Sequence, residues 1–165
     1  MKFIETLFLG FLIACASFIA QIFFELITKI FFHTDIVIHY SATDSTKHII
    51  FIMFIAAIIE ELIRYSFIKY KTVKHINKPI IDPIIYGVLL GIGFITLEII
   101  FSYFSNTLFI TPVISIIIVA MIHILLSIFL LFITKYKHTF IVDIPFVIIA
   151  ILLHVCGNFF LLQYM

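Results

Sequence analysis

The sequence is organised around seven residues, Ile58-Ile59-Glu60-Glu61-Leu62-Ile63-Arg64, which place three ionisable side chains inside an apolar run. The run begins at Ile49 and resumes after Arg64 as far as Ile68, so Glu60 lies well inside a segment of membrane-spanning length. A charged side chain near the bilayer centre costs about 2.5–3.5 kcal/mol on insertion scales, so such residues usually face a protein interior or an aqueous cavity and function there. These three side chains therefore mark a candidate functional site.

Helical geometry leaves the pairing of Arg64 open. Glu60 lies four residues before Arg64 and Glu61 three residues before it, so either carboxylate can reach the guanidinium. Only one can pair well, and the other needs a partner on another helix. The simpler interpretation of the same residues is a buried ion-paired cluster that fixes helix packing.

Composition predicts an integral protein of the cell membrane. The chain has 165 residues, of which 64% are hydrophobic and 12% charged, and its mean hydropathy is +1.31. Soluble domains are about 45–50% apolar and about 25% charged. The net charge of +1 and the lack of a basic stripe exclude a nucleic-acid partner. Cys15 and Cys156 lie in apolar runs and are interpreted as packing residues.

We expect an all-α fold, a polytopic transmembrane helical bundle that forms a single domain over residues 1–165. Five spans are predicted, at residues 3–32, 49–68, 83–104, 112–133 and 144–162, with an exterior loop at 33–47. Basic residues cluster after the second and fourth spans, which favours a cytoplasmic N-terminus and an extracytoplasmic C-terminus. Because tryptophan is absent, the candidates for an interfacial aromatic belt are Tyr40, Tyr65, Tyr70, Tyr103 and Tyr136.

Two further patterns concern helix packing. Gly87-x-x-x-Gly91 predicts a face of the third span that another helix approaches closely. In the first span Gln21, Glu25 and Lys29 recur every four residues and form one polar stripe. We interpret this stripe as the interfacial outer end of the helix, with a solvated Glu25–Lys29 pair, in preference to a part of the site.

Polar residues of four spans lie at similar depths. From the rise of 1.5 Å per residue, Glu60 is about 17 Å from the outer end of its span, and His123 and His154 are about 15–17 Å into theirs. Glu98, about 22 Å from the cytoplasmic start of the third span, is somewhat nearer the outside. Because each polar group in lipid needs a partner, we expect these side chains to share one polar pocket.

The residue types in this pocket suit hydrolysis. A buried glutamate can act as a general base toward water, and a histidine can orient that water or protonate a leaving amine. His154-x-x-x-Asn158 puts two donors on one helix face, where they could stabilise an oxyanion. The same groups also suit a metal site of Glu60, His123 and His154, for example for zinc. Both mechanisms stay open, whereas a nucleophilic role for Ser127, four residues after His123, is less favoured because serines in spans often bond to their own helix.

Four blocks of this sequence resemble the PrsW-type intramembrane protease family, related to the CAAX prenyl protease and bacteriocin-processing (CPBP, Abi) superfamily. They cover about residues 50–162, behind a first span and loop at 1–47. The blocks are Glu60-Glu61-x-x-Arg64, Tyr86-Gly87-x-x-x-Gly91-Ile92-Gly93-Phe94-x-x-x-Glu98, His123-x-x-x-Ser127 and His154-x-x-x-Asn158. The first block has arginine at Arg64 where family members usually carry lysine, and Ile99 stands where asparagine usually follows the third-span glutamate.

The resemblance implies a peptidase that cuts a membrane-anchored or lipid-proximal substrate. The catalytic residues it implies are Glu60, Glu61, His123, His154 and Asn158, with Arg64, Glu98 and Ser127 in support. Water activated by Glu60 or Glu61 is the favoured mechanism, with Glu60 as the preferred base, and a divalent metal such as zinc is the alternative. Two other functions stay open: a non-catalytic scaffold that binds a partner protein, and a small proton-coupled carrier.

Overall fold

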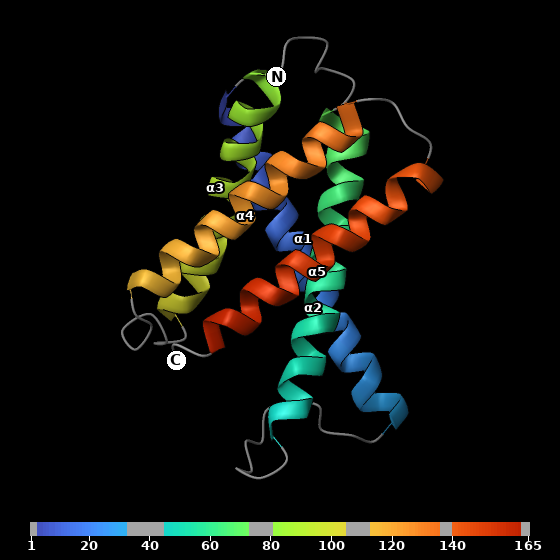
Figure 1. Ribbon diagram of the computed structural model, residues 1–165. Coiled ribbons are helices and arrows are strands. Elements are labelled where there is room, and N and C mark those ends of the chain that lie inside the picture. The colour runs from blue at the N-terminus through green and yellow to red at the C-terminus, as the bar shows by residue number, and fades with distance from the viewer. Residues whose placement is uncertain (1–2, 33–44, 73–80, 105–112, 136–139, 163–165) are drawn as a thin grey trace.

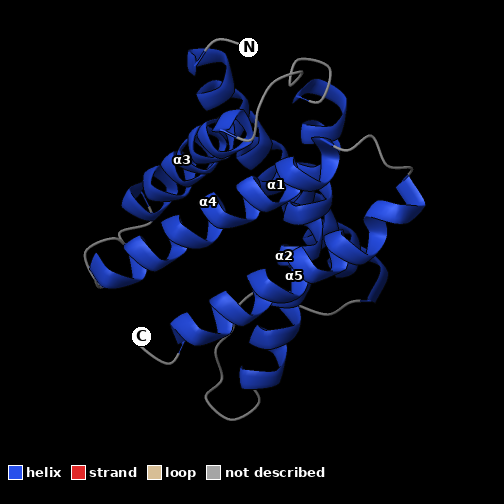
Figure 2. Ribbon diagram, turned by 45° about the horizontal axis from the view of Figure 1, so that its top comes forward, coloured by secondary structure: helices blue, strands red, loops and turns tan. Residues whose placement is uncertain are grey.

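The computed structural model describes residues 3–32, 45–72, 81–104, 113–135 and 140–162, all of which are helical (Figure 2). The helices are α1 (Phe3–Phe32), α2 (Ser45–Phe67), α3 (Ile81–Phe104), α4 (Val113–Lys135) and α5 (Phe140–Leu162). A π-helical turn, η1 (Ile68–Thr72), continues α2. The prediction of an all-α bundle is confirmed.

Some predicted boundaries were wrong by a few residues. The exterior loop was predicted as far as Lys47, but α2 begins at Ser45, a residue type that favours the start of a helix. The second helical segment was predicted to end at Ile68, but η1 extends it to Thr72. The apolar pattern ends at Ile68, yet lysine is a good helix former, so hydropathy alone marks this end too early.

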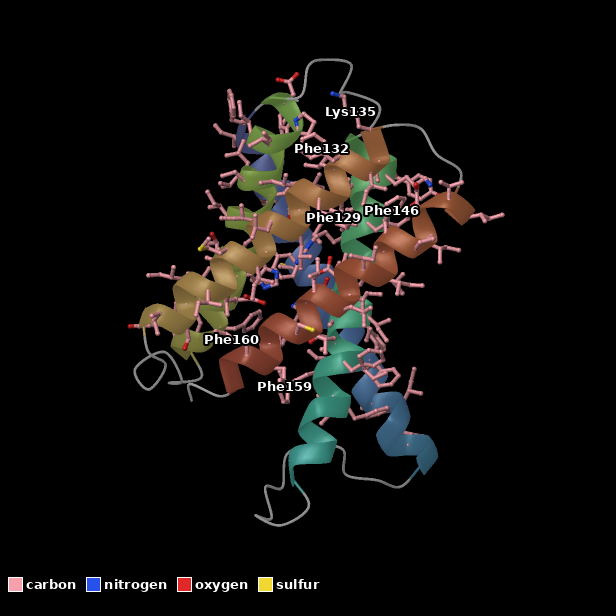
Figure 3. All side chains as sticks on the ribbon, in the orientation of Figure 1. Phe129, Phe132, Lys135, Phe146, Phe159 and Phe160 are labelled. Atoms are coloured by element: carbon pink, nitrogen blue, oxygen red, sulfur yellow. The ribbon has the colours of Figure 1, made fainter. Side chains whose placement is uncertain are left out.

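The chain reverses direction at each successive helix, so that α1, α3 and α5 run one way and α2 and α4 the other (Figure 1). The start of α1, the turn η1 and the end of α4 therefore lie at the same end of the bundle. Lys69 in η1 and Lys135 at the end of α4 (Figure 3) share this end. This arrangement agrees with the predicted topology, in which both basic clusters lie on one side of the membrane.

Four helices are long and apolar enough to cross a membrane, at Phe3–Phe24, Asp82–Phe101, Ile114–Lys135 and Ile141–Phe160. Large apolar side chains on their surfaces are exposed, for example Ile4 at 81% and Ile141 at 77%. Such a surface fits hydrocarbon and not water. The remaining helix, α2, has 23 residues, but its charged residues keep it outside this composition class, so the second predicted span, at 49–68, stays a prediction.

Helix α3 packs between α1 and α4 through its glycines. A Cβ built on Gly91 would lie 2.6 Å from the Cα of Ile124 in α4, and one built on Gly93 would lie 3.0 Å from the backbone nitrogen of Phe11 in α1. Only glycine allows backbones to approach this closely. The close packing predicted from Gly87 and Gly91 is confirmed, and it brings α3 next to His123, the residue before Ile124.

Tyr65 was predicted as a candidate for the interfacial belt, but it is buried, with 2% of its surface exposed. Its hydroxyl donates to Oδ2 of buried Asp143 in α5 at 2.5 Å. Lys69 Nζ donates to the Tyr65 oxygen at 2.6 Å and to Asp143 Oδ2 at 2.8 Å. This Lys69–Tyr65–Asp143 cluster joins one end of α2 to the start of α5.

The remaining tyrosine candidates divide into two groups. Tyr70 and Tyr103 are exposed, as the predicted belt requires. Tyr40 and Tyr136 lie outside the described residues.

Candidate active site

The polar side chains predicted to share one pocket do lie together. Figure 3 shows nitrogen and oxygen atoms gathered in the middle of the bundle, between α4 and α5. Hydrogen bonds and ion pairs connect the residues of this cluster, which are Glu60, Glu61, Arg64, Glu98, His123 and His154. Helices α2, α3, α4 and α5 each contribute at least one of them.

Glu61 is the partner of Arg64. Arg64 Nη1 donates to Glu61 Oε1 at 2.6 Å, and at most 1% of either side chain is exposed. The same oxygen lies 2.7 Å from His154 Nδ1. Because an ionised carboxylate can only accept, His154 Nδ1 carries a proton and donates it. Glu61 therefore holds the guanidinium of α2 and the imidazole of α5 at one point, and this resolves the pairing that spacing left open.

Arg64 also determines which ring nitrogen of His123 carries the proton. Its Nη2 lies 2.7 Å from His123 Nδ1, and a guanidinium only donates hydrogen bonds, so Nδ1 must be the acceptor. The proton of the neutral ring is then on Nε2, which lies 3.1 Å from Glu98 Oε1 and donates to it. In this arrangement His123 is a hydrogen-bond donor and cannot act as the general base.

Phe94 packs against two residues of the cluster, Arg64 and His123. The Arg64 guanidinium lies 4.4 Å from the Phe94 ring centroid, and the His123 ring stacks on the same phenyl ring at 4.5 Å between centroids. A cation over an aromatic face is stabilised by the ring quadrupole. Phe94 was not singled out by sequence analysis, although it belongs to the block that ends at Glu98.

Glu60 is held differently from Glu61. Gln21 Nε2 of α1 donates to Glu60 Oε1 at 2.8 Å. The other oxygen, Oε2, is buried and has no hydrogen-bond partner among the residues that the structure describes. It lies 3.5 Å from His154 Nε2. Glu60 Oε2 and His154 Nε2 are thus two polar atoms of the cluster that face each other without a direct hydrogen bond.

Three residues of the cluster form a candidate metal site. Glu60, His123 and His154 each offer one ligand atom, and these atoms lie within 4.8 Å of one another. The orphaned Oε2 of Glu60 and the Nε2 of His154 fit a metal as they stand, and Glu61 on His154 Nδ1 resembles the carboxylates that orient metal-binding histidines. His123 fits only after a rearrangement, because both of its nitrogens already have partners.

Two of the predicted site residues are not joined to this cluster. Asn158 is partly exposed on α5, one turn after His154, and its side chain takes part in none of the hydrogen bonds that join this cluster among the described residues. Ser127 is buried with 1% exposed, but its Oγ has no partner among those residues, so the expected bond back to its own helix is absent there.

The direct contact between Gln21 and Glu60 was not predicted from the sequence. Gln21 was interpreted, with Glu25 and Lys29, as part of an interfacial stripe, whereas it hydrogen-bonds to Glu60. The side chains of Glu25 and Lys29 lie outside the described residues. The available signal was a polar residue in an apolar helix, but spacing along α1 cannot say which helix it faces.

The chain was compared with known proteins. Neither the curated proteins nor the solved structures gave a match. The model of the PrsW family of intramembrane metalloproteases matches residues 4–164, which is nearly the whole chain. The protein is therefore an integral, multi-pass membrane protein that belongs to the PrsW family of intramembrane metalloproteases.

Proposed function

We propose that this protein is an endopeptidase that hydrolyses a peptide bond in a membrane-anchored or lipid-proximal substrate, with Glu60 as the general base. The observation that supports it is the position of Glu60 Oε2, which is buried, lacks a hydrogen-bond partner among the described residues and faces His154 Nε2 at 3.5 Å. A water that hydrogen-bonds to this carboxylate oxygen, beside the imidazole, would have the surroundings that general-base catalysis requires.

The proposed hydrolysis has two steps, attack by water and loss of the amine. Glu60 takes a proton from water while the water oxygen attacks the carbonyl carbon of the scissile bond. His123 Nε2–H, on leaving Glu98, donates a hydrogen bond to the oxyanion that develops. The carbon–nitrogen bond then breaks, and the proton held by Glu60 passes to the leaving amine, directly or through His154. Glu61 and Arg64 do not react but hold the two histidines.

The oxyanion role of Asn158 stays a prediction, because its amide makes no hydrogen bond to the cluster among the described residues. A rotation of its side chain toward the His154 side of α5 would be needed. The relation of this family to the CAAX prenyl proteases also stays a proposal, supported by the order of the motifs alone.

A metal is the family's described requirement, and here Glu60, His154 and, after rearrangement, His123 would hold it. A bound zinc ion would lower the pKa of a water to about 7 and polarise the carbonyl. Glu61 would keep its function in this version, because it orients His154 from the opposite nitrogen.

The test is to purify the protein in mild detergent, measure its metal content, and incubate it with a library of membrane-anchored peptides. Glu60→Gln should lower the rate of cleavage by about 10²–10⁴-fold, the usual contribution of general acid–base catalysis. The matched control is Glu5→Gln, the same change at an exposed glutamate in the first turn of α1, and it should leave the rate unchanged.

Two results would overturn the proposal. Cleavage that survives in Glu60→Gln would remove Glu60 from the chemistry. If no peptide is cleaved by the folded wild-type protein, with or without added zinc, the scaffold function is favoured instead.

A further inference from the structure

One side chain of α1 reaches the proposed catalytic carboxylate. Gln21 Nε2 donates to Glu60 Oε1 at 2.8 Å, between two residues that lie 39 positions apart. The four sequence blocks that predict the site lie in the other helices, and Gln21 belongs to none of them. Helix α1 therefore contributes a neutral amide to the site.

The position of Gln21 follows from the buried face of α1. Ile13, Ala14 and Ser17 on this face are at most 4% exposed. The Ser17 hydroxyl donates to the carbonyl of Ile13 in its own helix at 2.9 Å, so it needs no partner elsewhere. Gln21 lies one turn further on the same face, and its longer side chain crosses to α2.

The bond between Gln21 and Glu60 is partly buried, and an apolar surface lies next to it. An apolar groove between α1 and α2 is lined by residues that directly precede the two partners, Ala20 before Gln21 and Ile59 before Glu60, and by Phe24. No polar side chain among the lining residues of this groove competes for the amide or for the carboxylate.

The two neighbouring glutamates are held by different chemistry. Glu61 is tied by the charge of Arg64, which occupies its Oε1 together with His154. Glu60 is tied by a neutral donor at Oε1, so its orientation is fixed without a cation beside it. With Oε1 occupied, the geometry leaves Oε2 directed at His154 Nε2.

We propose that Gln21 is a positioning residue for Glu60. Its amide holds Oε1 and thereby leaves Oε2 free to accept a proton from a water that binds beside Glu60 and His154. This inference rests on the proposed function, because it assigns to Gln21 the task of orienting the proposed base. It adds α1 to a site whose other residues come from α2 to α5.

The test compares two variants that separate the donor from the shape. Gln21→Met keeps the length of the side chain but has no donor, whereas Gln21→His changes the shape but keeps a ring N–H at a similar distance from the backbone. For a model substrate from the peptide library, Gln21→Met should lower kcat by about 10–100-fold with little change in KM, the loss expected for one hydrogen bond to a charged group. Gln21→His should recover most of that loss.

The matched control is Ser17→Ala, one turn earlier on the same face, which removes a hydroxyl that bonds only within α1 and should leave kcat unchanged. Thermal unfolding in detergent verifies that each variant is folded. If Gln21→Met does not fold, Gln21→Leu, a second apolar side chain that has no donor, replaces it in the comparison.

The possible failures are distinguishable. If Glu60→Gln is inactive but Gln21→Met matches the wild-type kcat, or exceeds Gln21→His, then the residue only fills space and the inference is overturned while the function stands. If Glu60→Gln is active, the proposed function itself fails, whatever the Gln21 variants do.

Discussion

Removal of Arg64 should destabilise the protein more than removal of Arg64 together with its partner. In Arg64→Met the buried carboxylate of Glu61 would keep the His154 contact but lose the cation 2.6 Å away. Breaking a buried pair by removing one partner typically costs about 3–5 kcal/mol. The cation over the Phe94 ring contributes about 0.5–2 kcal/mol more.

The double variant Arg64→Met with Glu61→Gln provides the internal comparison. The amide that replaces the Glu61 carboxylate has no charge to leave unpaired, and its oxygen can still accept from His154 Nδ1. Replacing both members of a buried pair is often close to neutral, so the double variant should recover a large part of the stability lost in the single variant.

Arg64→Lys tests the fork of the guanidinium. An ammonium can reach Glu61 or His123 but does not reproduce two parallel donors and a stacked plane. The expected loss is about 1–3 kcal/mol, for the bond to His123. An ammonium keeps a positive charge beside Glu61, so this variant should fold and cleave, at a lower rate because His123 Nδ1 is no longer held as an acceptor.

The assay is reversible unfolding in mixed detergent micelles, titrated with sodium dodecyl sulfate and followed by circular dichroism. It gives the free energy of unfolding of the wild type, of Arg64→Met, of Glu61→Gln and of the double variant. The coupling energy of the pair follows from these four values. If the losses of the two single variants simply add in the double variant, then Arg64 and Glu61 do not compensate each other's charge, and the description of the site is wrong.

Two further predictions concern the scaffold around the site. Gly91→Ala should lower both the unfolding free energy and the rate of cleavage, because the added Cβ meets the backbone of Ile124. Gly157→Ala should change both less, because its Cβ meets mainly the flexible end of a side chain. Unfolding titrations and rates of peptide cleavage test this difference. Asp143→Asn should weaken the attachment of Lys69 to α5 and lower the unfolding free energy by about 1–3 kcal/mol; an unchanged unfolding curve would refute this.

The effect of pH on this attachment follows from its charges. Burial lowers the pKa of Lys69, but its hydrogen bonds with Asp143 and Tyr65 outweigh that effect, so the pKa lies above its ordinary value. Because the pKa is raised in the folded state, the protonated amine stabilises that state fully at any pH below the unfolded pKa of about 10.4. This stabilisation is lost only as the pH rises through the folded pKa. The attachment is therefore insensitive to pH near neutrality.

The convergence of the site could be predicted from the sequence, because the cost of an isolated polar group in lipid forces such groups together. Depth along each span placed Glu60, His123 and His154 at one level, and the structure brings their ligand atoms within 4.8 Å of one another. Depth does not determine the orientation of Asn158, which is partly exposed one turn after His154. Depth determines the level of a side chain, but the rotation of each helix about its axis determines which way it faces.

The contacts of individual residues required the structure. Spacings of three and four residues both allow a pair with Arg64, so periodicity could not choose between Glu60 and Glu61. Asp143 falls at the start of a span, where a carboxylate suggests only a solvated end, yet Tyr65 and Lys69 approach it from 78 and 74 positions earlier in the sequence. Such pairings depend on the crossing of α2 and α5 and leave no local signal.

The adjacency of the two glutamates explains why one sequence block can supply both a support and a reactive group. Successive residues of a helix point about 100° apart, so Glu61 faces Arg64 and α5 while Glu60 faces α1 and the gap beside His154. Each therefore meets a different first partner, a guanidinium for one and an amide for the other. If Glu60 and Glu61 were to exchange these roles, α2 would have to turn about its axis by that angle. The turn would break the contacts to Gln21, His123 and His154 together.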